Sequence, residues 1–192
     1  MIRYNPEDLK KALDILFEGG IILYPTDTIW GIGCDANNSE AVKRIYELKK
    51  REDSKSMLVL INDTNRIPSY LEEMPDIAWD LTEVSEKPLT IIYPGAKNLA
   101  ANLIAKDKTI GIRVTSDPFC NSLIKKFKRP IVSTSANISG QASPANFSEI
   151  SDEIKTQVDY IVKHRQNEKE KAKPSGIIQL GINGQVKVIR EA

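Results

Sequence analysis

Polar side chains that could bind a charged ligand follow two apolar stretches of the chain. The run at 21–23 opens into Thr26, Asp27 and Thr28, and the run at 130–132 opens into STSANISG at 133–140. Such groups at the end of a strand lie where α/β sheets place ligands. Ser135 and Asn137 would point the same way in extended chain, toward one ligand. The structural alternative is a tight turn, for which Ser, Asn and Gly are usual.

A basic cluster lies at the predicted exit of a helix. Lys49, Arg51 and Lys55 occur within seven residues, in the segment LKKREDSK. Cations at a helix C-terminus are stabilised by the helix dipole, which is the structural explanation. The same guanidinium and ammonium groups also suit phosphate, with bidentate geometry from the arginine. The cluster alone leaves both explanations open.

Two arginines belong to apolar strand patterns near the middle and the end of the chain. Arg113 lies within TIGIRV at 109–114, and Arg190 follows VKVI. A guanidinium in such a strand must stay hydrated or be paired. A carboxylate or phosphate ligand is the functional explanation, and an internal ion pair or an exposed strand face is the structural one.

Other familiar sites are disfavoured by spacing. GIGCDA at 31–36 matches the weak G-x-G-x-x-A form of a dinucleotide site, but the next helix is predicted to begin only at Ser39. Cys34 and Cys120 have no partner at metal spacing, so we expect buried free thiols. The chain has no G-x-S-x-G motif, and its one histidine, His164, lies in a charged run where we expect it to be solvated.

Alternating helical and strand patterns would position these groups. Helices are predicted from Pro6 to the Gly19-Gly20 pair and over 39–50, 75–86, 118–127 and 147–156. Strands are predicted over 21–24, 29–33, 57–61, 89–93, 109–114, 130–133, 159–162, 175–180 and 185–189. The last two read as a hairpin, and the early crossovers suggest parallel pairs. We therefore expect an α/β domain with a mixed twisted sheet.

Composition gives no global argument for a nucleic-acid or membrane surface. The 192 residues carry 27 basic and 26 acidic side chains, a net charge of +1, and we expect one domain over 1–192. The N-terminus has no apolar signal region, and the longest uncharged run, 130–148, is too polar for a membrane helix. We expect a cytoplasmic protein. The charged run 164–173 predicts a solvated, mobile loop, with a lid over a site as the alternative.

Taken together, five motifs resemble the YrdC/TsaC family of threonylcarbamoyl-adenylate synthases over nearly the whole chain. They are YPTDTIWGIG, Lys49-x-Arg51, IGIRV, Ser135-x-Asn137 in STSANISG, and PSGIIQL. Each is weak alone, but the set is specific. The resemblance implies a YrdC-like twisted mixed β-sheet with flanking helices and a concave ligand-binding face.

The activity implied by this resemblance is the condensation of L-threonine, bicarbonate and ATP to threonylcarbamoyl-AMP and pyrophosphate. The product would feed the tRNA modification threonylcarbamoyladenosine, with downstream tRNA threonylcarbamoyl transferase proteins as partners. Mg²⁺ would arrive on the ATP, and no metal-ligand set follows from the sequence.

The resemblance also implies residue roles. The catalytic tetrad would be Lys49, Arg51, Ser135 and Asn137. Threonine would be bound by Thr28, Arg113, Ser135 and Ser175. ATP would be bound by Arg51, Lys55, Thr109, Asn137, Ser143 and Arg190. The chain departs from the family pattern at 55–57 and 143–145, and the charged run before Pro174 replaces a segment that usually contains glycine.

Two other functions stay open. A paralogue of the YciO type would use another acceptor and weakens the Lys-x-Arg and Ser-x-Asn positions, all four of which are present here. A non-enzymatic RNA-binding protein, or weak RNA binding by the enzyme, would use a basic face made of Lys49, Lys50, Arg51, Lys55, Lys125, Lys126, Lys128 and Arg129. No aromatic-interleaved RNA-binding motif accompanies these residues.

Overall fold

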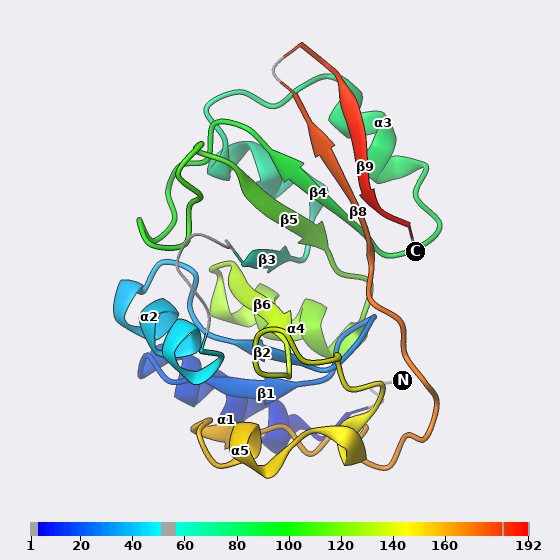
Figure 1. Cartoon of the computed structure of the whole chain (residues 1–192). Coiled ribbons are helices and arrows are strands. Elements are labelled where there is room, and N and C mark those ends of the chain that lie inside the picture. The colour runs from blue at the N-terminus through cyan, green and yellow to red at the C-terminus, as the bar shows by residue number, and fades with distance from the viewer. Residues whose placement is uncertain (1–3, 51–56, 182, 192) are drawn as a thin grey trace.

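One mixed sheet runs through the part of the chain that the computed structural model describes, residues 4–50, 57–181 and 183–191. Its nine strands lie in the order β7-β1-β2-β6-β3-β5-β4-β8-β9 (Figure 1). Their bounds are β1 (Ile22–Tyr24), β2 (Gly31–Gly33), β3 (Leu58–Ile61), β4 (Leu89–Tyr93), β5 (Ile110–Val114), β6 (Ile131–Ser135), β7 (Tyr160–Ile161), β8 (Gly176–Leu180) and β9 (Val186–Arg190).

The pairing of the strands confirms the predicted mixed sheet. The pairs β1–β7, β3–β5 and β4–β8 are parallel, and the remaining neighbours are antiparallel. The C-terminal hairpin β8–β9 is confirmed, and β9 forms an edge of the sheet with all five residues exposed. Each parallel pair joins strands that are not consecutive in the chain. The consecutive strands β1 and β2 are antiparallel.

The helices in the described part of the chain are α1 (Pro6–Phe17), α2 (Ser39–Leu48), α3 (Ile77–Glu83), α4 (Pro118–Phe127) and α5 (Asp152–Lys155), with 3₁₀ turns η1 (Thr64–Tyr70) and η2 (Phe147–Glu149). Three of these five helices, α1, α2 and α4, begin after a residue whose side chain accepts backbone N–H groups, whereas α3 and α5 have no side-chain cap. Asn5 and Asp117 cap α1 and α4 ahead of a proline, which favours a helix start. Asn38, not Ser39, caps α2. The predicted helix at 147–156 is two short pieces, η2 and α5.

Two apolar clusters bury opposite faces of the sheet. Ile22 and Tyr24 of β1 pack with α1 and α4, while Leu23 belongs to the larger cluster that includes α2. A strand covered on both faces needs apolar residues at consecutive positions, which explains the uninterrupted run at 21–23.

The start of the charged run 164–173 is attached to α1. The buried carboxylate of Asp8 accepts hydrogen bonds from Tyr160 Oη at 2.7 Å, Lys163 N at 3.0 Å and His164 N at 2.9 Å. The ring of His164 stacks on Phe119, with centroids 5.7 Å apart. The prediction that His164 is solvated is therefore wrong, because the ring is half-buried against aromatic neighbours.

Gly33 provides a test of the packing between β1, β2 and β6. A Cβ atom at this position would lie 2.6 Å from Val132 O and 2.7 Å from Tyr24 Cε1, closer than real contacts allow. We expect Gly33→Ala to lower the free energy of unfolding by about 1–3 kcal/mol, the usual cost of overpacking. Urea denaturation measures the change. Gly181→Ala is the control, since its Cβ would meet Gln185 Cβ at an ordinary 3.4 Å; equal losses in both variants would contradict the explanation.

Candidate active site

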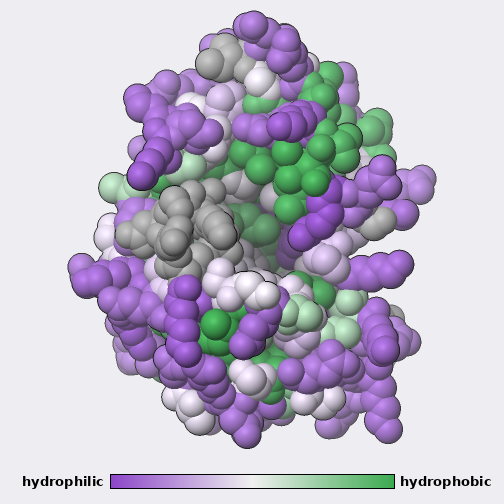
Figure 2. All heavy atoms as spheres, in the orientation of Figure 1, coloured by the Kyte–Doolittle hydropathy of each residue, from purple (hydrophilic) through white to green (hydrophobic). Residues whose placement is uncertain are grey.

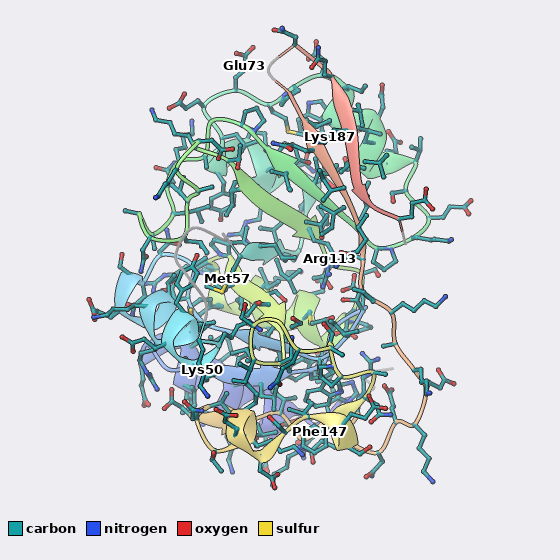
Figure 3. All side chains as sticks on the ribbon, in the orientation of Figure 1. Lys50, Met57, Glu73, Arg113, Phe147 and Lys187 are labelled. Atoms are coloured by element: carbon teal, nitrogen blue, oxygen red, sulfur yellow. The ribbon has the colours of Figure 1, made fainter. Side chains whose placement is uncertain are left out.

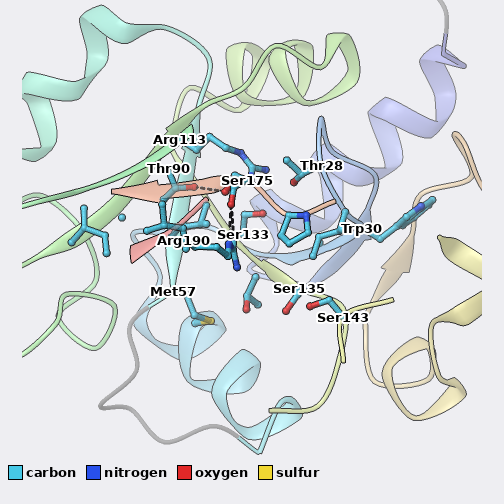
Figure 4. Close-up of a pocket in the computed structure, with 18 residues that line it drawn as sticks. Thr28, Trp30, Met57, Thr90, Arg113, Ser133, Ser135, Ser143, Ser175 and Arg190 are labelled. Atoms are coloured by element: carbon cyan, nitrogen blue, oxygen red, sulfur yellow. Dashed lines mark hydrogen bonds between the residues drawn. The ribbon is translucent and has the colours of Figure 1, made fainter. Parts of the chain in front are cut away.

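A pocket of about 250 Å³ lies on one face of the central strands. Its polar lining comes from Thr28, Thr90, Arg113, Ser133, Ser135, Ser143, Ser175 and Arg190 (Figure 4). We call it the front pocket. Figure 2 shows a hollow between the upper and lower parts of the molecule on this side. Met57 and Arg113 lie between the upper and lower parts of the molecule, whereas Glu73 lies near its upper end (Figure 3).

Strand alternation explains how distant segments contribute to one surface. Side chains two apart along a strand share a face, so Gly111 and Arg113 of β5 face the same way, as do Ser133 and Ser135 of β6. Leu58 of β3 pairs with both Gly111 and Ser133. Leu60, two residues further along β3, packs in the cluster of α1 and α4. These helices therefore cover one end of this face, and the front pocket occupies the part that they leave open.

The guanidinium of Arg113 has a binding capacity that the protein does not fill. Its Nη2 lies 3.1 Å from Asp27 Oδ1 and donates to Thr26 Oγ1 at 3.4 Å. Its Nε is buried and has no hydrogen-bond partner. An unsatisfied buried donor is costly, so this position is a destabilising feature of the ligand-free protein. The structural explanation of Arg113, an internal ion pair, is therefore confirmed, and its role in ligand binding stays a prediction.

A second arginine lies beside a pair of hydroxyl groups in the same pocket. Arg190 donates from Nε and Nη2 to the carbonyl of Ser175, at 2.9 and 2.7 Å. The hydroxyls of Ser175 and Thr90 lie 2.8 Å apart (Figure 4). Partial burial, followed by the charge of Arg113, lowers the pKa of Arg190, although an arginine stays protonated in proteins. Two guanidinium groups and several hydroxyls suit an anionic ligand.

Lys49 is buried and braces the segment after β6. Only 1% of the residue is exposed, and Nζ donates to Ser135 O at 2.5 Å and to Asn137 O at 2.6 Å. Its own carbonyl accepts from Ser139 N at 2.8 Å. The amine thus binds carbonyls at the end of β6 and in the segment that follows it. The other predicted residues of this cluster, Arg51 and Lys55, lie outside the described residues.

Two predicted site residues do not line the front pocket. β6 ends at Ser135, and Asn137 N bonds back to Ser135 O at 2.9 Å, so the chain turns here. The expectation that Ser135 and Asn137 point the same way is therefore wrong. Asn137 Nδ2 donates to Ile138 O and Gln141 O, while its Oδ1 is buried without a partner. Thr109 precedes β5 and donates to Asp107 Oδ1 at 2.7 Å.

Several lining residues were missed at the level of sequence. Thr90 is a polar residue inside the apolar strand 89–93, and Ser133 lies two residues before Ser135; both signals were available from strand alternation. Gly111 keeps the floor open, because a Cβ there would lie 3.2 Å from Leu58 Cβ. Trp30 and Met57 also line the pocket, and no local pattern distinguishes them from core residues.

The charged run 164–173 is anchored at its start beside the turn at 25–28. Arg165 Nη1 donates to Thr26 O at 2.8 Å and to Asp117 Oδ2 at 3.1 Å. Residues 167–171 are exposed. The prediction of a solvated loop therefore fits the second half of the run, while the first half is bonded to the structure.

Both cysteines are buried free thiols, as predicted. Burial raises the pKa of Cys34 and of Cys120, so both stay protonated at neutral pH. Cys120 Sγ donates to Pro25 O at 3.2 Å. Protonated, buried thiols are poor nucleophiles, which indicates a packing role.

The sheet and the front pocket define an α/β protein whose pocket is lined by arginines and hydroxyl groups of several strands. The chain belongs to the Sua5/YciO/YrdC family, because the family model described as "Telomere recombination" matches residues 14–192. Gly31 and Gly33 lie within β2 rather than at a helix N-terminus, so they do not form a dinucleotide-binding loop.

Relatives of known name cover most of the chain. A threonylcarbamoyl-AMP synthase of Pseudoalteromonas translucida is 32% identical over 154 residues, which are 79% of this chain and 82% of the relative. The crystal structure of E. coli YciO superposes with a TM-score of 0.84 at 28% identity, over 98% of this chain and 91% of that one. P. abyssi Sua5 complexed with L-threonine has the same fold, with a TM-score of 0.82 at 24% identity, over 93% of this chain. This chain covers 52% of that longer Sua5 chain.

The described residues contain no helix that is both long enough and apolar enough to cross a bilayer. In the same residues, no three His, Cys, Asp or Glu side chains gather into a metal-binding group.

The bracing role of Lys49 can be tested against its neighbour. We expect Lys49→Met to lower the free energy of unfolding by roughly 1–3 kcal/mol, since it leaves two carbonyls without their buried donor. Amide hydrogen exchange should become faster at residues 136–139. Lys50→Met is the matched control, because Lys50 is exposed and its ion pair with Glu153 is a surface contact. Similar exchange at 136–139 in both variants would argue against the brace.

Proposed function

We propose that this protein is an L-threonylcarbamoyladenylate synthase, a nucleotidyltransferase that condenses L-threonine, bicarbonate and ATP and releases pyrophosphate. The observation that carries the proposal is that Arg113 and Arg190 line one pocket together with several hydroxyl-bearing residues. This set suits a ligand with a carboxylate and phosphates. The name of the relative from Pseudoalteromonas translucida supports the choice of reaction.

In this proposal the strand ends bind threonine. The Arg113 guanidinium would bind the amino-acid carboxylate, and the hydroxyls of Thr28 and Ser175 would hold its polar groups. Ser135 lines the same pocket from β6, two strands away from Arg113, and would contact the same substrate. The threonine nitrogen would form a bond to the carbon of bicarbonate, with loss of water, to give a carbamate. A carbamate oxygen would then attack the α-phosphorus while pyrophosphate leaves.

Charge accumulates on the phosphoryl oxygens and on the leaving group in this reaction, so cations should supply much of the catalysis. Arg190 and Ser143 line the front pocket and are our candidates for ATP contacts in the described part of the chain. Arg51, Lys55, Thr109 and Asn137 stay predictions from family resemblance. Lys49 would act as a positioning residue, through the carbonyls that it binds.

We propose that Mg²⁺ enters bound to the triphosphate as part of the substrate. Mg²⁺ commonly keeps several waters and binds through substrate phosphates with few protein ligands. This mode of entry does not require a cluster of acidic residues. The adenylate would pass to tRNA threonylcarbamoyl transferase proteins, and a role in tRNA modification favours the cytoplasm as the compartment.

Two of the cations in the predicted RNA-binding face are engaged within the protein. Lys49 is buried, and Arg129 forms an ion pair with Asp35 at 2.8 Å. Binding of RNA without threonine-dependent turnover of ATP, and weakening steeply with salt, would still favour that alternative.

The deciding experiment is pyrophosphate release from MgATP and bicarbonate with L-threonine, with L-serine and with no amino acid. We expect release that depends on L-threonine. Binding of ATP without dependence on threonine would replace the proposal with a YciO-type activity on another acceptor.

Arg113 provides the residue-level test. We expect Arg113→Lys to raise the KM for threonine roughly ten- to hundredfold, because a hydrogen bond to a charged group contributes about 1.5–3 kcal/mol. The KM for ATP should change little. Arg66→Lys is the control, since Arg66 bonds to Asn62, Tyr70 and Lys128 O, outside the front pocket. Equal increases in both KM values would remove Arg113 from the threonine subsite.

A further inference from the structure

Asp27 lies behind the front pocket rather than in its lining. Its carboxylate lines a second cavity of about 150 Å³ on the opposite face of the sheet, together with Ile112 and Val114. Arg113 lies between these two residues in β5 and faces the front pocket. The contact between Asp27 and Arg113 therefore joins a carboxylate on one side of the sheet to a guanidinium that serves the other.

This contact is buried from both sides. The side chains of Arg113 and Asp27 are 4% and 7% exposed. Removing one partner of a buried ion pair leaves an uncompensated charge, so the pair has a strong energetic reason to stay together. Thr26 supports the arrangement: its Oγ1 donates to Ile29 O at 2.8 Å and accepts from Thr28 N at 3.0 Å.

The pair engages only part of the Arg113 guanidinium. Nη2 lies at ion-pair distance from Asp27 Oδ1 and donates a hydrogen bond to Thr26 Oγ1, whereas Nε and Asp27 Oδ1 have no hydrogen-bond partner. A guanidinium is planar and rigid, so fixing Nη2 also fixes the direction of the Nε–H bond. Arg190, whose pKa is lowered in part by the charge of Arg113, is a second cation that would otherwise repel it.

We propose that Asp27 is a positioning residue that holds the Arg113 guanidinium in the front pocket, where the guanidinium binds the carboxylate of the amino-acid substrate. The inference rests on the proposed function for the identity of that substrate. Asp27 itself does not touch the ligand; it acts through Arg113.

Two roles of the Asp27 charge predict opposite effects of its removal on ligand affinity, so the test distinguishes them. If the carboxylate merely lowered the positive potential of the pocket, Asp27→Asn would bind an anionic ligand more tightly. If the carboxylate holds Arg113 in place, the nearly isosteric asparagine loosens the guanidinium and binding becomes weaker.

The experiment titrates wild-type protein and Asp27→Asn with L-threonine and with L-threoninol, which has an alcohol in place of the carboxylate, by calorimetry. We expect Asp27→Asn to lower threonine affinity by about tenfold or more, as for other buried charge pairs that lose one partner. Threoninol affinity and ATP affinity should be unchanged. Tighter threonine binding, or equal weakening for threonine and threoninol, would overturn the inference.

Asp35→Asn is the matched control. Asp35 is a buried carboxylate paired with Arg129, and neither residue lines the front pocket. It should lose stability without losing the preference for threonine over threoninol. The Arg129 side chain is 53% exposed, so this pair is buried on its carboxylate side only. A parallel loss of that preference would mean that removing the charge of any buried, arginine-paired Asp has the same effect, which contradicts a specific role for Asp27.

A double-mutant comparison covers the case in which Asp27→Asn does not fold. Arg113→Gln with and without Asp27→Asn should bind threonine equally, because Asp27 then has no guanidinium to hold. Unequal affinities overturn the inference. Wild-type protein that prefers threonine over threoninol but releases no pyrophosphate would refute the proposed function and leave the inference standing; wild-type protein without the preference would refute the inference whatever its turnover.

Discussion

The site depends on a positive charge placed inside a sheet. Arg113 occupies a strand position whose neighbours along the chain are apolar, and burial of its guanidinium is tolerated only with compensation. Asp27 compensates the charge in part, and the surrounding hydroxyls provide polar contacts. In the proposed function, the guanidinium is also what attracts an anionic ligand to the pocket. A core built from apolar residues alone would be more easily stabilised and would exert no such attraction.

Small residues make the arrangement possible. Gly111 faces the same side of the sheet as Arg113, and the narrow space beside Leu58 shows that a larger residue would fill the floor of the pocket. Gly31 and Gly33 in β2 also lie in narrow spaces, where an added Cβ atom would approach Tyr24 and residues of β6. The glycines of the motif GIG therefore permit close packing of strands, which is why a motif that superficially resembles a phosphate loop belongs to a β-strand here.

Local features of the fold were predictable from sequence, and features that depend on distant partners were not. The caps at Asn5 and Asp117 use side chains within three residues of the groups that they bind, so their signals are local. The antiparallel pairing of β1 with β2 and the insertion of β6 beside β2 depend on contacts across the chain. The sequence offered the helix dipole or phosphate as partners of Lys49 and could not show its bonds to Ser135 and Asn137, because these carbonyls lie almost ninety residues away. The bend at Asn137 was hidden by the assumption of extended chain beyond β6.

The two arginines of the pocket lie in strands that differ in how firmly the sheet holds them. Arg190 ends β9, which is paired only with β8 and exposed along its whole length, whereas Arg113 lies in a strand with neighbours on both sides. Edge elements with few buried contacts open locally at a lower free energy than central strands. Brief separation of β9 from β8 would withdraw one of the two cations while the central strands keep their pairing. The electrostatic field of the pocket is therefore linked to the fraying of the C-terminus, and two protein molecules with the same core can differ in their attraction for an anion.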